Sequence, residues 1–559
     1  MKKLLQLIAG NVILLFLIGQ AAFAQDSLKI INARILDGTG NSWYWGEIMV
    51  ANGKILSIKK TAGLHVTGGS SSAALGSSVQ ASANSKPSTR DPQLPTLNVT
   101  GLRIIDANGL IASPGFIDVH AHIETGVFER PTADNYIYDG VTTVVTGNCG
   151  NSFDDIGDFF RKIDSMKTSI NVATLVGHNT VRRLGMGLGN RQATPDELKK
   201  MEDLVTKAMQ DGAVGMSTGL IYLPGMYSST EEIVDLAKIV AAKGGVYATH
   251  MRNEGLKVTD AINEALTIGR QANIPVEISH FKVSGRASWG RSTETLDMVL
   301  KARLEGYDVT IDQYPYTASS TNLAVTVPDW ALDGGLDSLR VRMKDKNTRD
   351  KIIKDMEYAG KEGKNKNYSY AVVANYPSDT TLNGKSISQI NKEKGRKSKF
   401  KDEAQTILDM LDKGNAQMVY HSMNEDDVKY IMKYPFNMPA ADGGVSNGKG
   451  IPHPRTYGTN ARVLGRYVRE LKVISLEEAV RRMTSLPAQK FNLSDRGLLR
   501  EGMAADILLF DENKVSDAAT FEKPHQFSLG IPYVIVNGQI VIDEGKHTGI
   551  KSGQSLRKK

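Results

Sequence analysis

Two histidines separated by a single residue are suited to binding one metal ion. His120 and His122 follow the apolar run 110–119, and side chains two residues apart in an extended strand point to the same side. The pattern His-x-His is a weak signal of a metal site when it stands alone. Asp118 and an apolar strand just before the pair make the signal stronger. The sequence therefore predicts two imidazole ligands at the end of a strand.

Other candidate ligands close further apolar runs in the same way. Cys149, His178, His250 and His280 each stand at the end of one. Thiolate and imidazole ligands favour zinc, and Cys149, the chain's one cysteine, is predicted to bind one zinc ion or to bridge two. With His250 and His280 it forms a three-ligand set that leaves a fourth position open for water, which is typical of a catalytic zinc site.

Asp442 closes the last apolar run and is the candidate for proton transfer. Zinc lowers the pKa of a bound water molecule to about 7, and a nearby carboxylate can take that proton and return it to a leaving amine. The alternative interpretation of Asp442 is a turn residue before Gly443 and Gly444. For His178 two interpretations stay open: it orients a ligand from behind, or it simply packs.

The elements that position these residues are predicted to be strands and helices in alternation. Amphipathic segments such as 195–212 and 258–274 separate the short apolar runs. Eight strands alternating with helices imply an α/β fold, a (β/α)8 barrel of the TIM type, whose active site lies where the carboxyl ends of the strands meet. The eight apolar runs are 110–120, 141–147, 170–178, 213–219, 245–250, 274–280, 307–315 and 436–442.

The two ends of the chain carry runs typical of strands and are predicted to pair into a small β-sandwich domain. Val536–Gln539, with Asn-Gly at its centre, is a good hairpin turn between apolar runs. A Lys-rich stretch at about 325–415 interrupts the barrel pattern and is predicted to be an insertion over the barrel mouth. The expected division is 25–110 and 486–548 for the β domain, 111–485 for the barrel, a flexible Ser/Ala/Gly-rich insertion at 68–95, and a solvated basic tail at 549–559.

The first 24 residues have the features of a signal peptide. Lys2 and Lys3 precede an apolar stretch that ends at Ala22-Phe23-Ala24, a small-residue cleavage site, so we expect export to the periplasm or the medium. An uncleaved membrane anchor is the alternative. The formal net charge of +7 over 559 residues is modest and does not point to a nucleic-acid partner.

Several sequence blocks resemble the D-aminoacylases, which are N-acyl-D-amino-acid deacylases of the metal-dependent amidohydrolase superfamily. The resemblance runs from about residue 103 to 510. It implies a (β/α)8 barrel with a small β domain and zinc-dependent hydrolysis of N-acyl-D-amino acids to a carboxylate and a free D-amino acid. The blocks are GFIDVHAH, GVTTVVTGNCG, YATHMRNE, EISHFKVSG, ASWGRS, AADGG and HPRTYGT.

The same resemblance implies roles for individual residues. Cys149, His250 and His280 match the ligands of one tightly bound zinc ion. His120 and His122, with Cys149 shared, resemble the ligands of a second, weaker metal position. Asp442 matches the catalytic aspartate.

The substrate would be a small molecule, an N-acyl amino acid, and its carboxylate also has matching residues. Lys282, Tyr314 and Arg455 match residues that bind this carboxylate, and Ser320 lies near the same pocket. The guanidinium fork of an arginine is well suited to a carboxylate. Binding of an acidic substrate side chain would need a second cation. The candidates are Arg183, Arg252 and Arg286, and the alternative is that none of them serves.

Three other functions compete with this one. Cyclic-amide hydrolases of the hydantoinase or dihydroorotase type use a modified lysine on the fourth strand, and the fourth run here, 213–219, has no lysine. A dipeptidase acting on D- or isoaspartyl peptides shares the metal chemistry. A binding protein built on an inactive barrel would be expected to have lost a ligand or Asp442.

Overall fold

The computed structural model describes residues 27–63 and 101–558. The predicted signal peptide, 1–24, and the predicted insertion, 68–95, lie outside the described residues. Within those residues, none of the helices combines the length and the apolar character needed to cross a lipid bilayer.

The predicted α/β barrel is confirmed. Eight parallel strands surround a common axis, and every one of their residues is buried. The third strand has two parts on either side of Leu175. The first part pairs with the second strand of the barrel, and the second part pairs with the fourth. The strands are β6 (Phe116–Asp118), β7 (Val141–Thr146), β8 (Asn171–Thr174) continued by β9 (Val176–Gly177), β10 (Gly215–Gly219), β11 (Val246–His250), β12 (Val276–Ile278), β13 (Val309–Gln313) and β17 (Asn437–Pro439).

The barrel closes at a seam between its first and last strands. Ala121 forms a parallel bridge with Gly443. The amide N–H of Asp442 donates to the carbonyl oxygen of His120 at 2.9 Å, and that of His122 donates to the carbonyl oxygen of Gly443 at 2.8 Å. The buried carboxylate of Asp118 accepts from the amide groups of both His120 and Ala441, each at 2.9 Å. The seam therefore joins the His120–His122 segment directly to the Asp442 segment.

Helices cover the outside of the barrel, and their sequences explain their ends. Thr194 and Glu197 form a reciprocal capping box at the start of α6, with Pro195 in its first turn. The buried residues of this helix, Met201, Val205 and Ala208 among them, recur at helical spacing. The covering helices are α4 (Ile156–Met166), α5 (His178–Met186), α6 (Pro195–Gln210), α7 (Thr230–Ala242), α8 (Val258–Ala272), α9 (Ser292–Leu304), α14 (Glu425–Met432), α15 (Arg455–Arg462) and α16 (Leu476–Met483).

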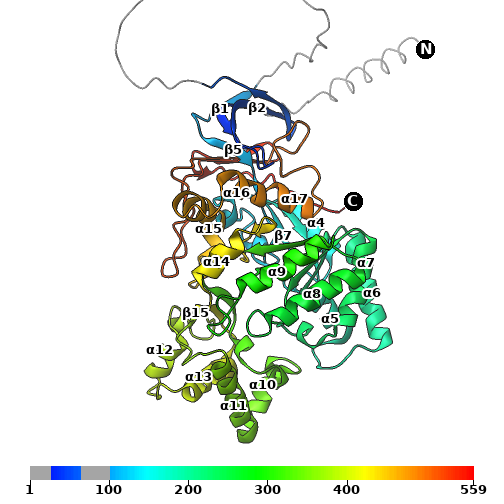
Figure 1. Cartoon of the computed structure of the whole chain (residues 1–559), viewed down its shortest axis with the longest axis vertical. Coiled ribbons are helices and arrows are strands. Elements are labelled where there is room, and N and C mark those ends of the chain that lie inside the picture. The colour runs from blue at the N-terminus through cyan, green and yellow to red at the C-terminus, as the bar shows by residue number, and fades with distance from the viewer. Residues whose placement is uncertain (1–26, 64–100, 559) are drawn as a thin grey trace, which may run out of the picture.

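The two ends of the chain share one nine-stranded sheet at the amino-terminal side of the barrel, at the top of Figure 1. β18 joins the halves by pairing antiparallel with β5. The predicted hairpin forms, because Val536 pairs with Gln539 while Asn537 and Gly538 adopt positive φ angles. The strands are β1 (Ser27–Ile35), β2 (Tyr44–Ala51), β3 (Lys54–Lys60), β4 (Leu102–Asp106), β5 (Ile111–Pro114), β18 (Ile507–Phe510), β19 (Tyr533–Val536), β20 (Gln539–Asp543) and β21 (Lys546–His547).

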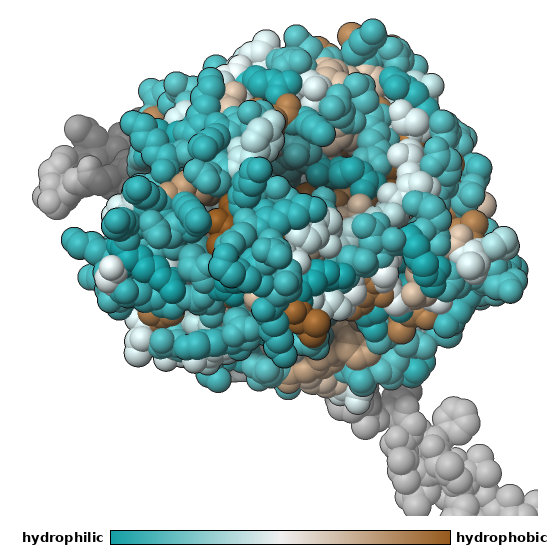
Figure 2. All heavy atoms as spheres, turned by 90° about the horizontal axis from the view of Figure 1, so that it is seen from below, coloured by the Kyte–Doolittle hydropathy of each residue, from teal (hydrophilic) through white to brown (hydrophobic). Residues whose placement is uncertain are grey.

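A lobe inserted between β13 and β17 occupies the opposite end of the molecule (Figure 1). It has a hydrophobic core of its own, separate from the barrel core, and its outer face is mostly hydrophilic (Figure 2). Its first strand starts at Ser319 and its last ends at Tyr420, so it is somewhat larger than the stretch 325–415. Its elements are β14 (Ser319–Asn322), α10 (Leu336–Lys344), α11 (Lys346–Glu362), β15 (Ala371–Asn375), α12 (Ile387–Glu393), α13 (Phe400–Lys413) and β16 (Gln417–Tyr420).

The C-terminal tail pairs with the barrel through its backbone, while the basic side chains of Lys551 and Arg557 are exposed. Its backbone runs along the amino-terminal half of β8, where Val172 forms a parallel bridge with Ser555. The amide of Val172 donates to Gln554 and the amide of Leu556 donates to Val172, while Arg557 pairs with Asp164 at 2.7 Å. The tail therefore fills an edge of β8 that would otherwise leave backbone groups unpaired, a role that its charge pattern does not reveal.

We predict that ending the chain at Lys551 lowers the melting temperature by several degrees without changing metal content. The truncation removes the backbone hydrogen bonds of Gly553, Gln554, Leu556 and Lys558. At about 0.5–1.5 kcal/mol for each bond, the loss is roughly 2–6 kcal/mol of unfolding free energy. Thermal unfolding measures it, with Arg557→Ala as a control that removes the ion pair with Asp164 and the stacking on Phe160 but keeps the backbone hydrogen bonds of the tail. Equal melting temperatures for the truncated and full chains would show that the tail contributes nothing to stability.

Candidate active site

The thiol of Cys149 lies at the centre of a buried group of imidazoles at the carboxyl ends of the barrel strands. Its Sγ atom is 3.3 Å from His120 Nε2, 3.6 Å from His250 Nδ1 and 3.5 Å from His280 Nε2. Two groups of potential metal ligands share this thiol. One is Cys149, His250 and His280, and the other is His120, His122, Cys149 and Asp442. The structure thus brings together all five predicted metal ligands and Asp442.

The backbone at these positions turns sharply so that the side chains can converge. Cys149, His280 and Asp442 have φ angles of 51°, 35° and 47°, in the left-handed region that residues with a side chain rarely adopt. Such strain costs roughly 1–3 kcal/mol per residue and is typically found at functional sites. Three strained residues around one thiol therefore mark this end of the barrel as a functional site.

The motif Gly-Asn-Cys-Gly has a steric explanation. Gly147 and Gly150 flank the thiol with φ angles of 77° and 76°. A Cβ atom on Gly147 would lie 2.1 Å from the carbonyl oxygen of Leu175, and one on Gly150 would lie 2.2 Å from Asn179 Oδ1. Ser217 on β10 accepts a hydrogen bond from the Gly150 amide at 3.0 Å and donates to the Gly147 carbonyl. Ser217 thus supports the loop that carries Cys149.

Buried carboxylates orient two of the imidazoles. His120 Nδ1 is 3.0 Å from Asp312 Oδ2, which leaves Nε2 directed at the thiol. His280 Nδ1 is 2.9 Å from Glu254 Oε1, which leaves its Nε2 directed at the thiol as well. Hydrogen bonds of this kind fix the tautomer and ring orientation of metal-binding histidines. Sequence reasoning missed both carboxylates, although Asp312 stands in an apolar run and Glu254 in the block YATHMRNE.

Lys282 is buried beside His280 and Glu254, 5.5 Å from the ring of Tyr314 on which Arg455 also stacks. Its ammonium group donates to Glu254 Oε1 at 2.5 Å and is 2.8 Å from His280 Nδ1. Although burial alone would raise the pKa of Glu254, the charge of Lys282 holds that pKa below its ordinary value. Glu254 therefore stays ionised and can accept a hydrogen bond from the His280 ring.

The electrostatics of the site fit a bound cation. Burial, reinforced by the charge of Asp442, raises the pKa of the Cys149 thiol well above its usual value. Burial lowers the pKa of His120 and lowers that of His250 still further, so both imidazoles are neutral and keep a lone pair. His250 Nε2 is buried without a hydrogen-bond partner. A thiol, neutral imidazoles and a carboxylate form a donor set that binds zinc or a similar divalent metal. A bound cation would favour the thiolate form of Cys149.

Asp442 is held in place by a histidine on one side and an arginine on the other. Its Oδ1 atom is 3.2 Å from His122 Nε2, and its Oδ2 atom is 2.8 Å from an Nη atom of Arg455. Burial opposes ionisation of this carboxyl, but the charge of Arg455 holds its pKa well below the usual range. Asp442 is therefore a carboxylate that can accept a proton next to the thiol and imidazoles.

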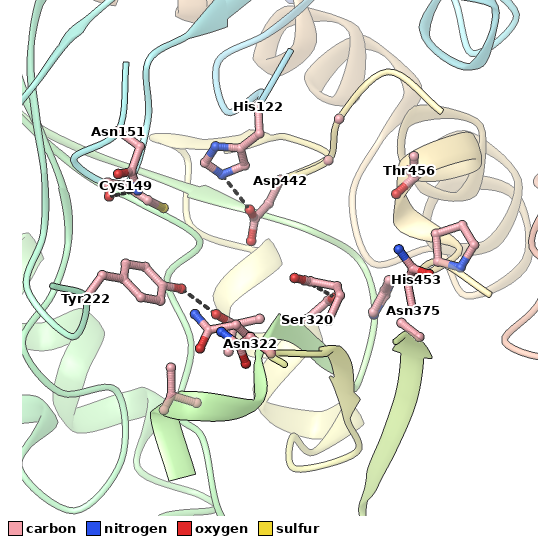
Figure 3. A pocket seen from close by; sticks show the side chains of 18 of the residues that line it. His122, Cys149, Asn151, Tyr222, Ser320, Asn322, Asn375, Asp442, His453 and Thr456 are labelled. Atoms are coloured by element: carbon pink, nitrogen blue, oxygen red, sulfur yellow. Dashed lines mark hydrogen bonds and ion pairs between the residues drawn. The ribbon is translucent and has the colours of Figure 1, made fainter. Parts of the chain in front are cut away.

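A cavity of about 650 Å³ opens above these groups, between the barrel and the lobe. Figure 3 shows His122, Cys149 and Asp442 on one side of it and Tyr222, Asn322 and Ser320 on the other. The hydroxyl group of Tyr222 is 2.9 Å from Thr321 Oγ1 and so links the barrel to strand β14. Barrel and lobe together therefore form the walls of this cavity.

Arg455 lies in this cavity with spare hydrogen-bonding capacity. It is buried, and its Nε and Nη1 atoms have no hydrogen-bond partner in the structure. Its guanidinium group stacks 4.4 Å above the ring of Tyr314, whose buried hydroxyl group is also unpartnered. Ser320 lines the cavity with Arg455, and Lys282 and Tyr314 are not among its lining residues. The unpartnered donors of Arg455 are suited to a carboxylate.

His178 does not face the thiol. Its Nε2 atom is 2.9 Å from Glu232 Oε1 on helix α7, and the same carboxylate pairs with Arg182. Of the two interpretations of His178, the structure supports packing, because this buried ion-pair network ties α5 to α7.

Three comparisons with known proteins agree with this geometry. Residues 103–542 match the model of the amidohydrolase family. A D-aminoacylase from Alcaligenes xylosoxydans xylosoxydans is 35% identical over 475 residues, which cover 81% of this chain and 88% of that protein. An N-acyl-D-glutamate deacylase from the same organism is 33% identical over 478 residues, 82% of this chain and 88% of that one. The structure of an N-acyl-D-glutamate deacylase from Bordetella bronchiseptica, complexed with zinc and a phosphonate inhibitor, matches with a TM-score of 0.76 at 31% identity and covers 95% of this chain and 99% of its own.

We predict that Cys149→Ser loses the tightly bound metal while the protein stays folded. A hydroxyl group of nearly the same size replaces the thiol, but it does not ionise to give the anionic ligand that both groups share. Metal content per chain after dialysis, measured by atomic emission, should fall to a small fraction of the wild-type value. Wild-type metal content in the variant would reject Cys149 as a ligand.

We predict that Glu254→Gln weakens metal binding by roughly 10–100-fold, as is typical when the partner of a metal-binding histidine is removed. The amide keeps the size of the side chain but loses the negative charge that orients His280 and neutralises Lys282. Competition with a chelator measures the affinity. Glu264→Gln is the control, because it removes the charge of a carboxylate that pairs with Arg252 and not with a predicted metal ligand. Equal metal affinities of the two variants would contradict this role of Glu254.

Proposed function

The chain belongs to the amidohydrolase family, and on that premise we propose that it hydrolyses the amide bond of N-acyl-D-amino acids, giving a carboxylate and a free D-amino acid. The observation that carries the proposal is the shared thiol: Cys149 lies between two sets of ligand atoms, beside Asp442 and at the floor of a cavity that Arg455 lines. Relatives named D-aminoacylase and N-acyl-D-glutamate deacylase, each at least 33% identical, support the D series.

Zinc is the metal that we propose for the site. Cys149, His250 and His280 would hold the tightly bound ion, and His120, His122 and the shared Cys149 would form a second, weaker position. A zinc ion there supplies a Lewis acid for the amide carbonyl and a water molecule of lowered pKa. The thiol and imidazole donors support this choice, as does the zinc in the related Bordetella bronchiseptica structure.

Asp442 is proposed as the residue that moves the proton. Its carboxylate accepts a proton from the attacking water and delivers it to the amide nitrogen, so that the amine leaves as a neutral group. His122 and Arg455 hold the two oxygens in fixed positions. Positioned proton transfer of this kind contributes roughly 10²–10⁴-fold to the rate.

Arg455 is proposed to bind the α-carboxylate of the substrate. Its unpartnered Nε and Nη1 atoms can donate to the two carboxylate oxygens while its remaining Nη atom stays with Asp442. Tyr314 supports the guanidinium from below through its ring, and Ser320 shapes the wall beside it. Because Lys282 is bonded to Glu254, we propose that it acts on His280 and contributes to substrate binding only through its charge.

The alternative activities are less well supported. A cyclic-amide hydrolase needs a lysine on the fourth barrel strand, and β10 has the sequence Gly-Met-Ser-Thr-Gly. A dipeptidase acting on D- or isoaspartyl peptides shares the metal chemistry, but the relatives named D-aminoacylase and N-acyl-D-glutamate deacylase favour the deacylase. An inactive binding barrel would be expected to lack one of the ligands or Asp442, and all are in place.

We predict that zinc-loaded protein hydrolyses N-acetyl-D-methionine and leaves N-acetyl-L-methionine, hydantoins and dipeptides largely untouched. Release of the free amino acid is the measurement. Asp442→Ala is the matched control: it should keep its zinc and lose roughly 10²–10⁴-fold in kcat. Zinc-loaded protein that cleaves a hydantoin or a dipeptide but no N-acyl-D-amino acid would reject the proposal, and a near-normal rate in Asp442→Ala would reject the role of the aspartate.

A further inference from the structure

The cavity has few positive charges within the part of the chain that the structure describes. Its lining includes one arginine, Arg455, and one lysine, Lys449. Two histidines also line the cavity. His122 is paired with Asp442 at 3.2 Å. Burial and the charge of Arg455 hold the pKa of His453 well below the usual value. Both ring nitrogens of His453 are in use, since Nε2 donates to the Ala318 carbonyl at 3.0 Å and Nδ1 accepts from the Arg455 amide at 3.0 Å.

Arg455 is not free to bind a second carboxylate. One of its Nη atoms already pairs with Asp442. Under the proposed function, its other donors bind the α-carboxylate that every N-acyl amino acid carries. A substrate with an acidic side chain brings another carboxylate, which would need a further cation inside the cavity. A charged group that leaves water without such a partner is strongly disfavoured.

The arginines that the sequence offered for this purpose are engaged elsewhere. Arg183 pairs with Asp154 on the surface. Arg252 pairs with Glu264 and donates to the carbonyl oxygens of Met226 and Ser228. Arg286 stacks 5.4 Å from the ring of Trp289. None of the three lines the cavity.

Lys449 is a poor substitute for a buried cation. It belongs to the loop between Asp442 and Arg455, and its side chain is exposed to solvent. An exposed ion pair is screened by water and improves binding by only a few-fold. Lys449 therefore does not compensate for moving a side-chain carboxylate into the cavity.

The rest of the wall near the lobe is uncharged and largely apolar. Two of its residues follow strand β10 in the barrel, and the others come from the lobe, where most pack against the lobe core. Amide side chains, Asn322 and Asn415 among them, complete this wall. The apolar residues include Ile221, Leu223, Ala324, Val325, Leu332, Leu336 and Ala374.

We infer that this chain acts on N-acyl-D-amino acids whose side chains are uncharged, and that it discriminates against N-acyl-D-glutamate and N-acyl-D-aspartate. The inference rests on the proposed function and narrows its substrate class. Overall similarity does not decide the matter, because the D-aminoacylase and the N-acyl-D-glutamate deacylase are 35% and 33% identical to this chain. The preference between charged and uncharged substrate side chains is inferred from the charges on the cavity wall.

The test compares kcat/KM of the zinc-loaded full chain for N-acetyl-D-glutamine and N-acetyl-D-glutamate, which have nearly the same shape and differ in charge. N-acetyl-D-leucine serves as the apolar reference. We expect glutamine to exceed glutamate by roughly 10–100-fold, the effect of an unpaired charged group, and leucine to be turned over at least as well as glutamine. Equal values, or a preference for glutamate, would overturn the inference and leave the deacylase proposal intact. Failure to hydrolyse any of the three would reject both.

Variants of the wall sharpen the comparison. Val325→Lys places a cation among the apolar residues and should raise the glutamate-to-glutamine ratio by roughly three- to tenfold. Val325→Met, of similar length and without charge, should leave the ratio unchanged. Lys449→Met should also leave it unchanged. A wild-type preference for glutamate that disappears in Lys449→Met would show that the exposed lysine binds acidic side chains, contrary to the inference.

Discussion

The seam that closes the barrel determines where the candidate active site forms. Asp118 accepts hydrogen bonds from backbone amides on both sides of it, one on the segment of His120 and one on that of Asp442. The seam places the first histidine pair against an aspartate more than 300 residues later in the chain. Because Asp118 is buried, water does not compete for these bonds, and the alignment of the two segments is tightly specified. Opening the seam would separate His122 from Asp442 without changing either side chain.

The thiol of Cys149 depends on this alignment and on strain in its own loop. Two glycines and one cysteine adopt positive φ angles within four residues, and Ser217 holds the loop from the neighbouring strand. The hydrogen bonds of Ser217, the barrel closure and the packing around the loop offset the backbone strain. The candidate site thus combines a cavity, a carboxylate and several imidazoles that come from different elements of the barrel.

Much of this arrangement could be predicted from the sequence, because strand ends are visible in it. His120, His122, Cys149, His250, His280 and Asp442 each close an apolar run, and parallel strands in a barrel bring such ends together. The hydrogen-bond partners of these ligands could not be predicted, because they depend on the direction in which each side chain points. Glu254 is one charged residue among several in the sequence, and no pattern shows that Lys282, which the resemblance assigns to the substrate carboxylate, also pairs with Glu254 beside His280. The backbone pairing of the tail could not be predicted for a similar reason: its charges are visible in the sequence, whereas the free backbone edge of β8 is not.

The lobe between β13 and β17 folds around its own apolar core, apart from the core of the barrel. It nevertheless supplies most of the apolar wall of the cavity, while the barrel supplies the thiol, the imidazoles and the aspartate. Under the proposed function, the reaction chemistry belongs to the barrel, and the choice of substrate side chain belongs largely to the separately packed lobe. Residues such as Val325 and Leu336 are only partly buried, so the wall can be altered at little expense to folding. This division offers evolution, and protein engineering, a way to change what is recognised while the bond-breaking machinery stays constant.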